Sequence, residues 1–229
     1  MFHIHRYKVI LALLCFSFLA QAQELNPLYD RRPIRFGFGL MGNSAKLKFT
    51  TSENAIISDT LQRIETLNYP GFGLGGLVNF RLGDNMDTRV MLNIQFAQRD
   101  MNYTFRSDVA KTVGIESTYM EIPLAVKYKS KRHKNSRLYV LGGVTYRFDF
   151  TSDIDTERSN TKPIVALYPT TFSYDIGVGA SFYFPYFKFS PEVKLSNGLG
   201  NQRVPDGFVY ASSLERVSPK LLQFSLIFQ

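Results

Sequence analysis

The segment Met86-Asp-Thr-Arg-Val-Met-Leu-Asn-Ile-Gln-Phe-Ala-Gln-Arg-Asp-Met101 alternates between two sets of side chains. The first set is Thr88, Val90, Leu92, Ile94 and Phe96, and the second is Arg89, Met91, Asn93, Gln95 and Arg99. Successive side chains of a β-strand point to opposite faces, so a period of two indicates a strand with one apolar and one polar face.

The same alternation returns in residues 118–128, 138–150, 172–184 and 222–228. The polar face carries glycines and charged residues, and the charged ones are Arg89, Arg99, Glu121, Lys127, Arg147, Asp149, Asp175, Glu192 and Lys194. In a soluble barrel the apolar face would point inward and these charges would face water. In an outer-membrane barrel the faces are exchanged, because lipid contacts the apolar side chains and the polar ones fill the lumen.

The N-terminal residues decide between these two arrangements. Arg6 and Lys8 precede an apolar stretch over residues 9–19, and Ala20-Gln-Ala22 supplies the small residues that a signal peptidase needs. The stretch is too short for a retained membrane helix, which needs about 20 residues. We therefore predict a signal peptide over residues 1–22, cleaved before Gln23, and a barrel domain over residues 23–229 in the outer membrane. Because Cys15 leaves with the signal, disulfides and thiol chemistry are excluded from the mature chain.

The mature chain predicts an all-β fold, an eight-stranded antiparallel up-and-down transmembrane β-barrel. The expected strands are residues 34–48, 69–82, 86–106, 117–129, 137–150, 170–184, 187–196 and 217–229. Long polar connections are expected at residues 50–68, 107–116, 151–169 and 197–216, and they alternate with short turns. Outer-membrane barrels have short periplasmic turns and longer external loops, so the short turns are assigned to the periplasmic end.

Charged side chains are predicted to fill the lumen, since an eight-stranded barrel is just wide enough for side chains to occupy its interior. The expected network consists of Glu121, Arg147, Asp149, Asp175, Glu192 and Lys194. Mixed charges in a narrow lumen favour a structural role over a catalytic or binding site.

Register can be predicted at the tightest turn. If Pro185 and Tyr186 form a two-residue loop, Gly179 faces Glu192, Gly177 faces Lys194 and Phe182 faces Phe189. The two glycines would then leave room for the long charged side chains, and Pro191 should mark an irregularity because it cannot donate a ladder hydrogen bond.

The remaining motifs argue against an enzyme. His133 is the only histidine of the mature chain, so neither a metal site nor a Ser/His/Asp triad is expected, and no cofactor or small-molecule substrate is implied. The glycines of residues 71–76 lie within strand alternation rather than between a strand and a helix, so they are no phosphate loop. The chain has a net positive charge, but it also has a secretory signal and no nucleic-acid motif, so nucleic-acid binding is not expected.

Two segments are candidate partner surfaces. The basic turn over residues 129–137, with Lys131, Arg132 and Lys134, could contact inner-leaflet phosphates or an acidic periplasmic partner, or be a solvated hairpin. The long segment 197–216 keeps Val209, Tyr210 and Leu214 as apolar anchors, which an ordered loop that meets a partner would need.

Several motifs resemble known families. Tyr119-Met-Glu-Ile-Pro-Leu124 and Leu141-Gly-Gly143 resemble a broad family of small outer-membrane barrel domains. Tyr29-Asp30 and the segment Phe187-Lys-Phe-Ser-Pro-Glu-Val-Lys-Leu-Ser-Asn-Gly-Leu199 resemble the PorT family of the type IX secretion system. The family-like positions are Tyr29, Asp30, Pro191, Glu192, Asn197 and Gly198.

This resemblance implies a non-enzymatic accessory or assembly component of type IX protein secretion, in some bacteria linked to gliding motility. The implied partners are the outer-membrane bilayer and other proteins of the secretion machinery, with no catalytic residues. Two alternatives stay open. One is a stand-alone structural or adhesive barrel of the OmpA/OmpX kind with ligand-binding external loops, and the other is a lipid-modifying enzyme built on a small barrel.

Overall fold

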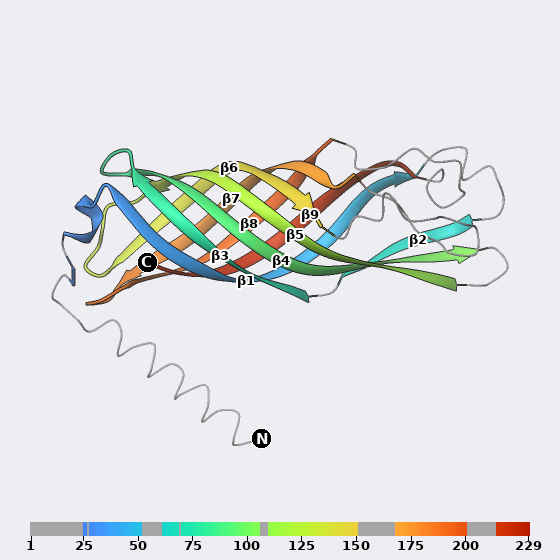
Figure 1. Ribbon diagram of the computed structural model, residues 1–229, viewed down its shortest axis with the longest axis horizontal. Coiled ribbons are helices and arrows are strands. Elements are labelled where there is room, and N and C mark those ends of the chain that lie inside the picture. Colours follow the sequence, from blue (N-terminus) through green and yellow to red (C-terminus); the bar gives the residue numbers. More distant parts are fainter. Residues whose placement is uncertain are drawn as a thin grey trace, which may run out of the picture.

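A computed structural model describes residues 25–26, 28–51, 61–68, 70–105, 110–150, 168–200 and 214–229. Within these ranges the chain forms one short 3-10 helix and a set of strands (Figure 1). The elements are η1 (Tyr29–Arg31), β1 (Ile34–Thr51), β2 (Leu61–Asn68), β3 (Pro70–Arg81), β4 (Met86–Phe105), β5 (Ala110–Lys129), β6 (Ser136–Asp149), β7 (Thr170–Tyr183), β8 (Lys188–Leu199) and β9 (Leu214–Phe228). The predicted signal peptide and its cleavage site lie outside the described residues.

The strands close into a barrel. Their order is β2-β4-β3-β1-β9-β8-β7-β6-β5, and β5 returns to β4 to close the sheet, with every pairing antiparallel. β2 and β3 both pair with β4 and follow one another along it, from Asn68 opposite Arg99 to Phe72 opposite Phe96. They therefore occupy one position in the wall, and the predicted eight-stranded antiparallel barrel is confirmed.

The wall has its apolar face outside. Leu92, Ile94, Val126 and Val144 are 54%, 43%, 42% and 50% exposed, whereas Glu121 and Lys194 are 0% and 4% exposed. The lumen buries mainly polar and charged side chains, beside small apolar clusters such as Met41, Leu77, Met91 and Ile227. This arrangement suits a barrel whose outer surface is covered by lipid. Among the residues described, no helix has the length and apolar character needed to cross a membrane.

The expected loops are partly wrong, because several strands run further than the alternation suggests. β2 lies within the predicted connection 50–68, and β5 begins at Ala110, within the predicted connection 107–116. The ladder of β4 and β5 continues to Thr104 opposite Ala110 (Figure 1). Beyond the bilayer an outward side chain need not be apolar, yet backbone groups still gain from pairing, so strands continue where the alternation ends.

The connection 197–216 is shortened in the same way. Asn197 and Gly198 belong to β8, and Leu214 is the first residue of β9, opposite Thr51, rather than a loop anchor. Val209 and Tyr210, the other two predicted anchors, lie outside the described residues.

The β7–β8 register is confirmed at all three predicted pairs. Gly179 faces Glu192, Gly177 faces Lys194 and Phe182 faces Phe189, and Phe184 N–H donates to the Phe187 carbonyl at 2.9 Å across the two-residue loop. The ladder is interrupted between Glu192 and Phe189 and resumes in the same register. Pro191 lies in this interruption, as its missing N–H predicts.

One end of the barrel gathers the short turns, residues 82–85, 130–135 and 184–187, together with η1 and Gln229 (Figure 1). Backbone hydrogen bonds join neighbouring parts of this end, from Arg81 to Pro33, from Lys129 to Asn85 and from Tyr183 to Asn135. Short turns lie on the periplasmic side of outer-membrane barrels. We call this end the periplasmic mouth.

Candidate functional site

Three ion pairs occupy the lumen. The Arg89 guanidinium donates to both carboxylate oxygens of Glu192 at 2.8 and 2.7 Å, and the Tyr139 hydroxyl donates to Glu192 at 2.8 Å. Arg147 Nε donates to Glu121 at 2.9 Å, and Lys194 Nζ lies 3.3 Å from Asp175. Every carboxylate in these pairs is at most 2% exposed, so the charges neutralise one another in a site closed to water.

Five of the six predicted network residues form these pairs. Asp149 lies half-buried at the end of β6, opposite Tyr119. Sequence reasoning placed Arg89 on the polar face but left it out of the network. The missing partner of Glu192 comes from β4, which is not adjacent to β8 in the wall, so no register between neighbouring strands identifies it.

Three further cations are held near the mouth. Lys127, 2% exposed, lies with its Nζ 3.7 Å from the ring centroid of Tyr139, the geometry of a cation–π contact. Asp87 binds both Arg35 and Lys129 at 2.7 Å and is 1% exposed. The polar alternation placed Lys127 on the inner face, and it could also have identified Asp87, which lies at an inward position of β4.

The Tyr29-Asp30 pair, singled out by family resemblance, lies in η1 at the periplasmic mouth. The Tyr29 ring is 5% exposed and meets the Tyr183 ring edge-on at 6.0 Å between centroids. Asp30 accepts hydrogen bonds from the Tyr183 hydroxyl at 2.8 Å and from Arg137 at 3.1 Å. We call η1 the cap, because its side chains bind inward-facing groups of the barrel at this end.

The cap residues have shifted pKa values. Burial raises the pKa of the Tyr29 hydroxyl to about 12. Burial also acts to raise the pKa of Asp30, but the Tyr183 hydrogen bond and the Arg137 charge outweigh it and lower the pKa below its usual value. Asp30 is therefore ionised at neutral pH and holds the cap as an anion.

Asp30→Asn is expected to destabilise the protein by about 1–3 kcal/mol at pH 7, since hydrogen bonds to a charged acceptor are lost. Because the folded pKa is depressed, this stabilisation is complete above the unfolded value of about 3.9 and is lost as pH falls through the folded pKa. Urea unfolding in detergent micelles at a series of pH values should show the difference from wild type shrinking in acid.

Asp84→Asn is the matched control for this variant. The Asp84 side chain lies at the same end but is 87% exposed, so its loss should change the unfolding free energy by no more than about 0.5 kcal/mol. A difference between wild type and Asp30→Asn that stayed constant down to pH 3 would show that the charge of Asp30 does not hold the cap.

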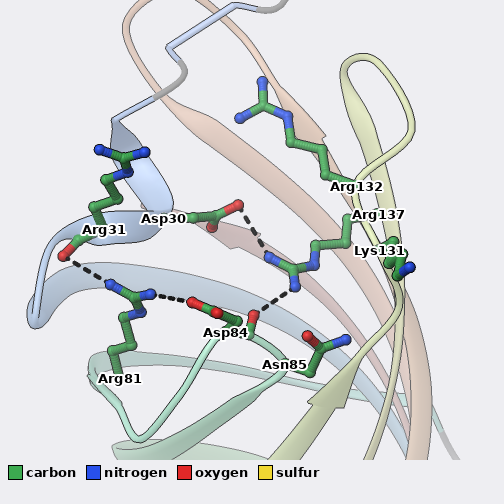
Figure 2. Close-up of a pocket in the computed structure, with 8 residues that line it drawn as sticks. All are labelled: Asp30, Arg31, Arg81, Asp84, Asn85, Lys131, Arg132 and Arg137. Carbon is green, nitrogen blue, oxygen red and sulfur yellow. Dashed lines mark hydrogen bonds and ion pairs between the residues drawn. The ribbon is translucent and has the colours of Figure 1, made fainter.

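A basic pocket of about 290 Å³ lies between the cap and two turns (Figure 2). Its lining residues are Asp30, Arg31, Arg81, Asp84, Asn85, Lys131, Arg132 and Arg137. Arg137 crosses it, donating to Asp30 and, at 2.6 Å, to the Asp84 carbonyl, while Arg81 binds Asp84 and the Arg31 carbonyl. We call it the cap pocket.

The candidate partner surface of the basic turn divides into two parts. Arg132 stacks on the Tyr183 ring at 3.8 Å and donates to the carbonyls of Leu25 and Lys134, so it fastens the chain before the cap. The side chains of Lys131 and Lys134 are exposed and free to meet a partner. Within the predicted surface, Arg132 therefore fastens the chain, whereas Lys131 and Lys134 remain exposed.

The remaining family-like residues do not gather at the cap. Glu192 lies in the lumen, Pro191 interrupts the β7–β8 ladder, and Asn197 and Gly198 lie at the far end of β8. His133 is exposed in the basic turn, and the described part of the chain holds no group of three or more His, Cys, Asp or Glu side chains that could bind a metal ion.

Comparisons with known proteins found one matching family model and several solved structures of low similarity. The sequence matches no curated protein. Solved structures with a similar outline include OprG from Pseudomonas aeruginosa, which is 14% identical, with 85% of this chain and 91% of that chain covered at a TM-score of 0.45. Neisserial surface protein A is 12% identical, with 83% and 95% covered at a TM-score of 0.42. Ail of Yersinia pestis, solved with the heparin analogue sucrose octasulfate, is 11% identical, with 84% and 96% covered at a TM-score of 0.39.

The family follows from the sequence match and agrees with the geometry. A model described as "Outer membrane protein beta-barrel domain" matches residues 20–202, which is most of the chain. The closed antiparallel wall, its apolar outer face and its ion-paired lumen are the features that such a domain requires. The chain therefore belongs to the outer membrane protein β-barrel domain family and is a protein of the outer membrane.

Proposed function

We propose that this barrel is a non-enzymatic accessory component of the type IX protein secretion machinery and of the gliding motility that depends on it in some bacteria. The observation that carries the proposal is the lumen itself, which is filled by the pairs Arg89–Glu192, Glu121–Arg147 and Asp175–Lys194. A barrel closed in this way offers no path to a polypeptide, so it would support a separate translocation pore rather than be one.

The position of the family-like motif supports the same role. Tyr29 and Asp30 form the cap, and the exposed cations Lys131 and Lys134 lie beside it at the periplasmic mouth. Cargo and most soluble partners of a secretion machine are met on the periplasmic side before export. A rigid, basic end is suited to holding an acidic partner there.

A deletion strain tests the proposal. Cargo proteins with a C-terminal secretion signal should accumulate unprocessed in the periplasm and disappear from the medium, and a plasmid copy of the wild-type chain should restore export. Immunoblots of the periplasmic and medium fractions measure both. Normal export in the deletion strain would remove the secretion role.

A second candidate function is a stand-alone barrel of the OmpA/OmpX kind that binds ligands at its external end. The observation that favours it is the length of β4 and β5, at 20 residues each, where about 9–11 suffice to cross the membrane. β4 and β5 extend beyond the rest of the barrel at the end opposite the periplasmic mouth (Figure 1), where a paired sheet would project above the bilayer. If the deletion strain exports cargo normally but loses attachment to surfaces, this alternative replaces the first.

A further inference from the structure

A second pocket, of about 510 Å³, opens at the rim of the periplasmic mouth, where the lipid-facing wall begins. Its lining combines polar residues of the cap region with outward residues of β1 and of the β7–β8 turn, and we call it the rim pocket. Six of the residues that line it are Arg32, Ile34, Arg35, Phe36, Tyr186 and Gln229.

One side of the rim pocket is apolar and faces the bilayer. Phe36 and Ile34 lie on the outer face of β1 with 72% and 48% of their surfaces exposed, and Tyr186 is 95% exposed in the adjacent turn. Aromatic side chains with one apolar and one polar end are typical of the membrane–water interface. An acyl chain that lies along the wall at Ile34 and Phe36 would pass this opening.

The other side of the rim pocket is cationic. Arg32 and Arg35 both line it, and no acidic side chain does, in contrast to the cap pocket with its two aspartates. The Arg32 guanidinium has no carboxylate partner within the described residues and lies 5.9 Å from the Tyr29 ring centroid. An arginine of this kind can extend along apolar surface while its charge reaches the interface.

Buried polar atoms of the same pocket lack partners. Arg35 is 3% exposed, and its two terminal nitrogens pair with Asp87 at 2.7 Å and Asp30 at 3.4 Å, yet its Nε donates no hydrogen bond in the described structure. Both side-chain amide atoms of Gln229 are likewise buried without a hydrogen-bond partner among the residues described. Buried groups of this type are normally satisfied, so a bound acceptor is expected to complete the two donors, Arg35 Nε and Gln229 Nε2.

These observations point to one ligand. We infer that the rim pocket binds a phospholipid of the inner leaflet, with the phosphate diester at Arg32, Arg35 Nε and the Gln229 amide, and the acyl chains along Ile34 and Phe36. A phosphate supplies several acceptors for the guanidinium groups, and the pocket volume lies in the range of about 300–1,000 Å³ that suits small ligands. The inference does not depend on the secretion role.

Lipid binding can be measured on the delipidated full barrel by native mass spectrometry in a neutral detergent. Short-chain phosphatidylglycerol is the test lipid, and diacylglycerol of the same chain length and inorganic phosphate are the two comparison probes. The wild-type protein should retain one phosphatidylglycerol, with much weaker binding of either comparison probe. Phosphate that bound as well as the lipid would mean that a free anion, not a lipid, occupies the pocket.

Arg32→Gln and Arg31→Gln form a matched pair of variants. The two arginines are neighbours and both are exposed, but Arg32 lines the rim pocket and Arg31 lines the cap pocket. Arg32→Gln should weaken phosphatidylglycerol binding about tenfold, as expected for the loss of a charge-assisted hydrogen bond, while Arg31→Gln leaves it unchanged. Arg32→Lys should retain part of the affinity.

Two further results would overturn the lipid site. One is an equal loss of binding in both variants, which would indicate general attraction to a basic surface. The other is a wild-type barrel that retains no phosphatidylglycerol. Both arginines lie outside the strands, and the shift in gel migration between unheated and boiled samples verifies that each variant still folds.

Discussion

Glu192→Ala is expected to destabilise the folded barrel by about 3–5 kcal/mol, the cost of removing one partner from a buried ion pair. The loss leaves the Arg89 guanidinium, 3% exposed, with no acceptor for two hydrogen bonds. The Tyr139 hydroxyl loses its acceptor too, and Lys127 remains beside an uncompensated positive charge. Urea unfolding in detergent micelles, followed by gel migration of unheated samples, measures the change.

Val193→Ala is the control for this variant. Val193 follows Glu192 on β8, faces lipid and is 42% exposed, so its truncation removes a few contacts with the bilayer and leaves the lumen intact. If Glu192→Ala were as stable as Val193→Ala but abolished cargo export, Glu192 would be a functional group rather than a structural one. The structural interpretation of the lumen would then be wrong.

Alternation in the sequence determines which face of its strand each residue occupies, and this was enough to predict a barrel wall with an apolar outer face and a polar inner face. The Arg147–Glu121 pair also follows from the pattern once neighbouring strands are registered, because the two residues face one another across β5 and β6. The Arg89–Glu192 pair does not follow, since it spans the lumen between strands that are not adjacent. Contacts across a barrel depend on its closure and strand tilt, which no local pattern encodes.

The cap is the second feature that the pattern could not supply. Residues 29–31 show no strand alternation and are too few for helical periodicity, so only family resemblance drew attention to Tyr29 and Asp30. Their role arises from partners far along the chain, Arg137 and Tyr183. Each partner is an inward residue at the end of a strand. A segment that covers the mouth can reach such residues and form hydrogen bonds with them.

The glycines of β7 were assigned the right face, but the prediction that they leave room for the charged side chains of β8 is wrong, because other residues lie nearest to them. Gly179 faces Glu192 along the ladder, yet a Cβ built on Gly179 would collide with the Tyr139 ring from β6. A Cβ built on Gly177 would lie 2.8 Å from the Val193 carbonyl oxygen and 3.2 Å from the Leu141 side chain. The glycines thus admit bulky residues from β6, and Tyr139 then carries the hydrogen bond to Glu192.

Gly179→Leu is consequently expected to prevent assembly or to destabilise the barrel severely. Overpacking alone costs about 1–3 kcal/mol. Displacing Tyr139 also breaks its hydrogen bond to the Glu192 carboxylate, which adds about 1.5–3 kcal/mol. The measurement is the folded fraction after refolding into detergent micelles, together with the unfolding free energy of whatever folds.

Gly76→Leu provides the matched control, because it makes the same substitution at an outward position of β3 where a built Cβ meets nothing within 4 Å. It should fold as the wild type does, which separates the collision at Gly179 from any general intolerance of leucine at a strand glycine.

The collision itself can be tested by adding Tyr139→Ala to Gly179→Leu, since the smaller residue frees the space that leucine needs. The double variant should then lose less stability than the two single variants together, because the steric term disappears once Tyr139 is absent. If the two losses of unfolding free energy were strictly additive, the two side chains would not compete for one space. The conclusion that Gly179 makes room for the Tyr139 ring would then be wrong.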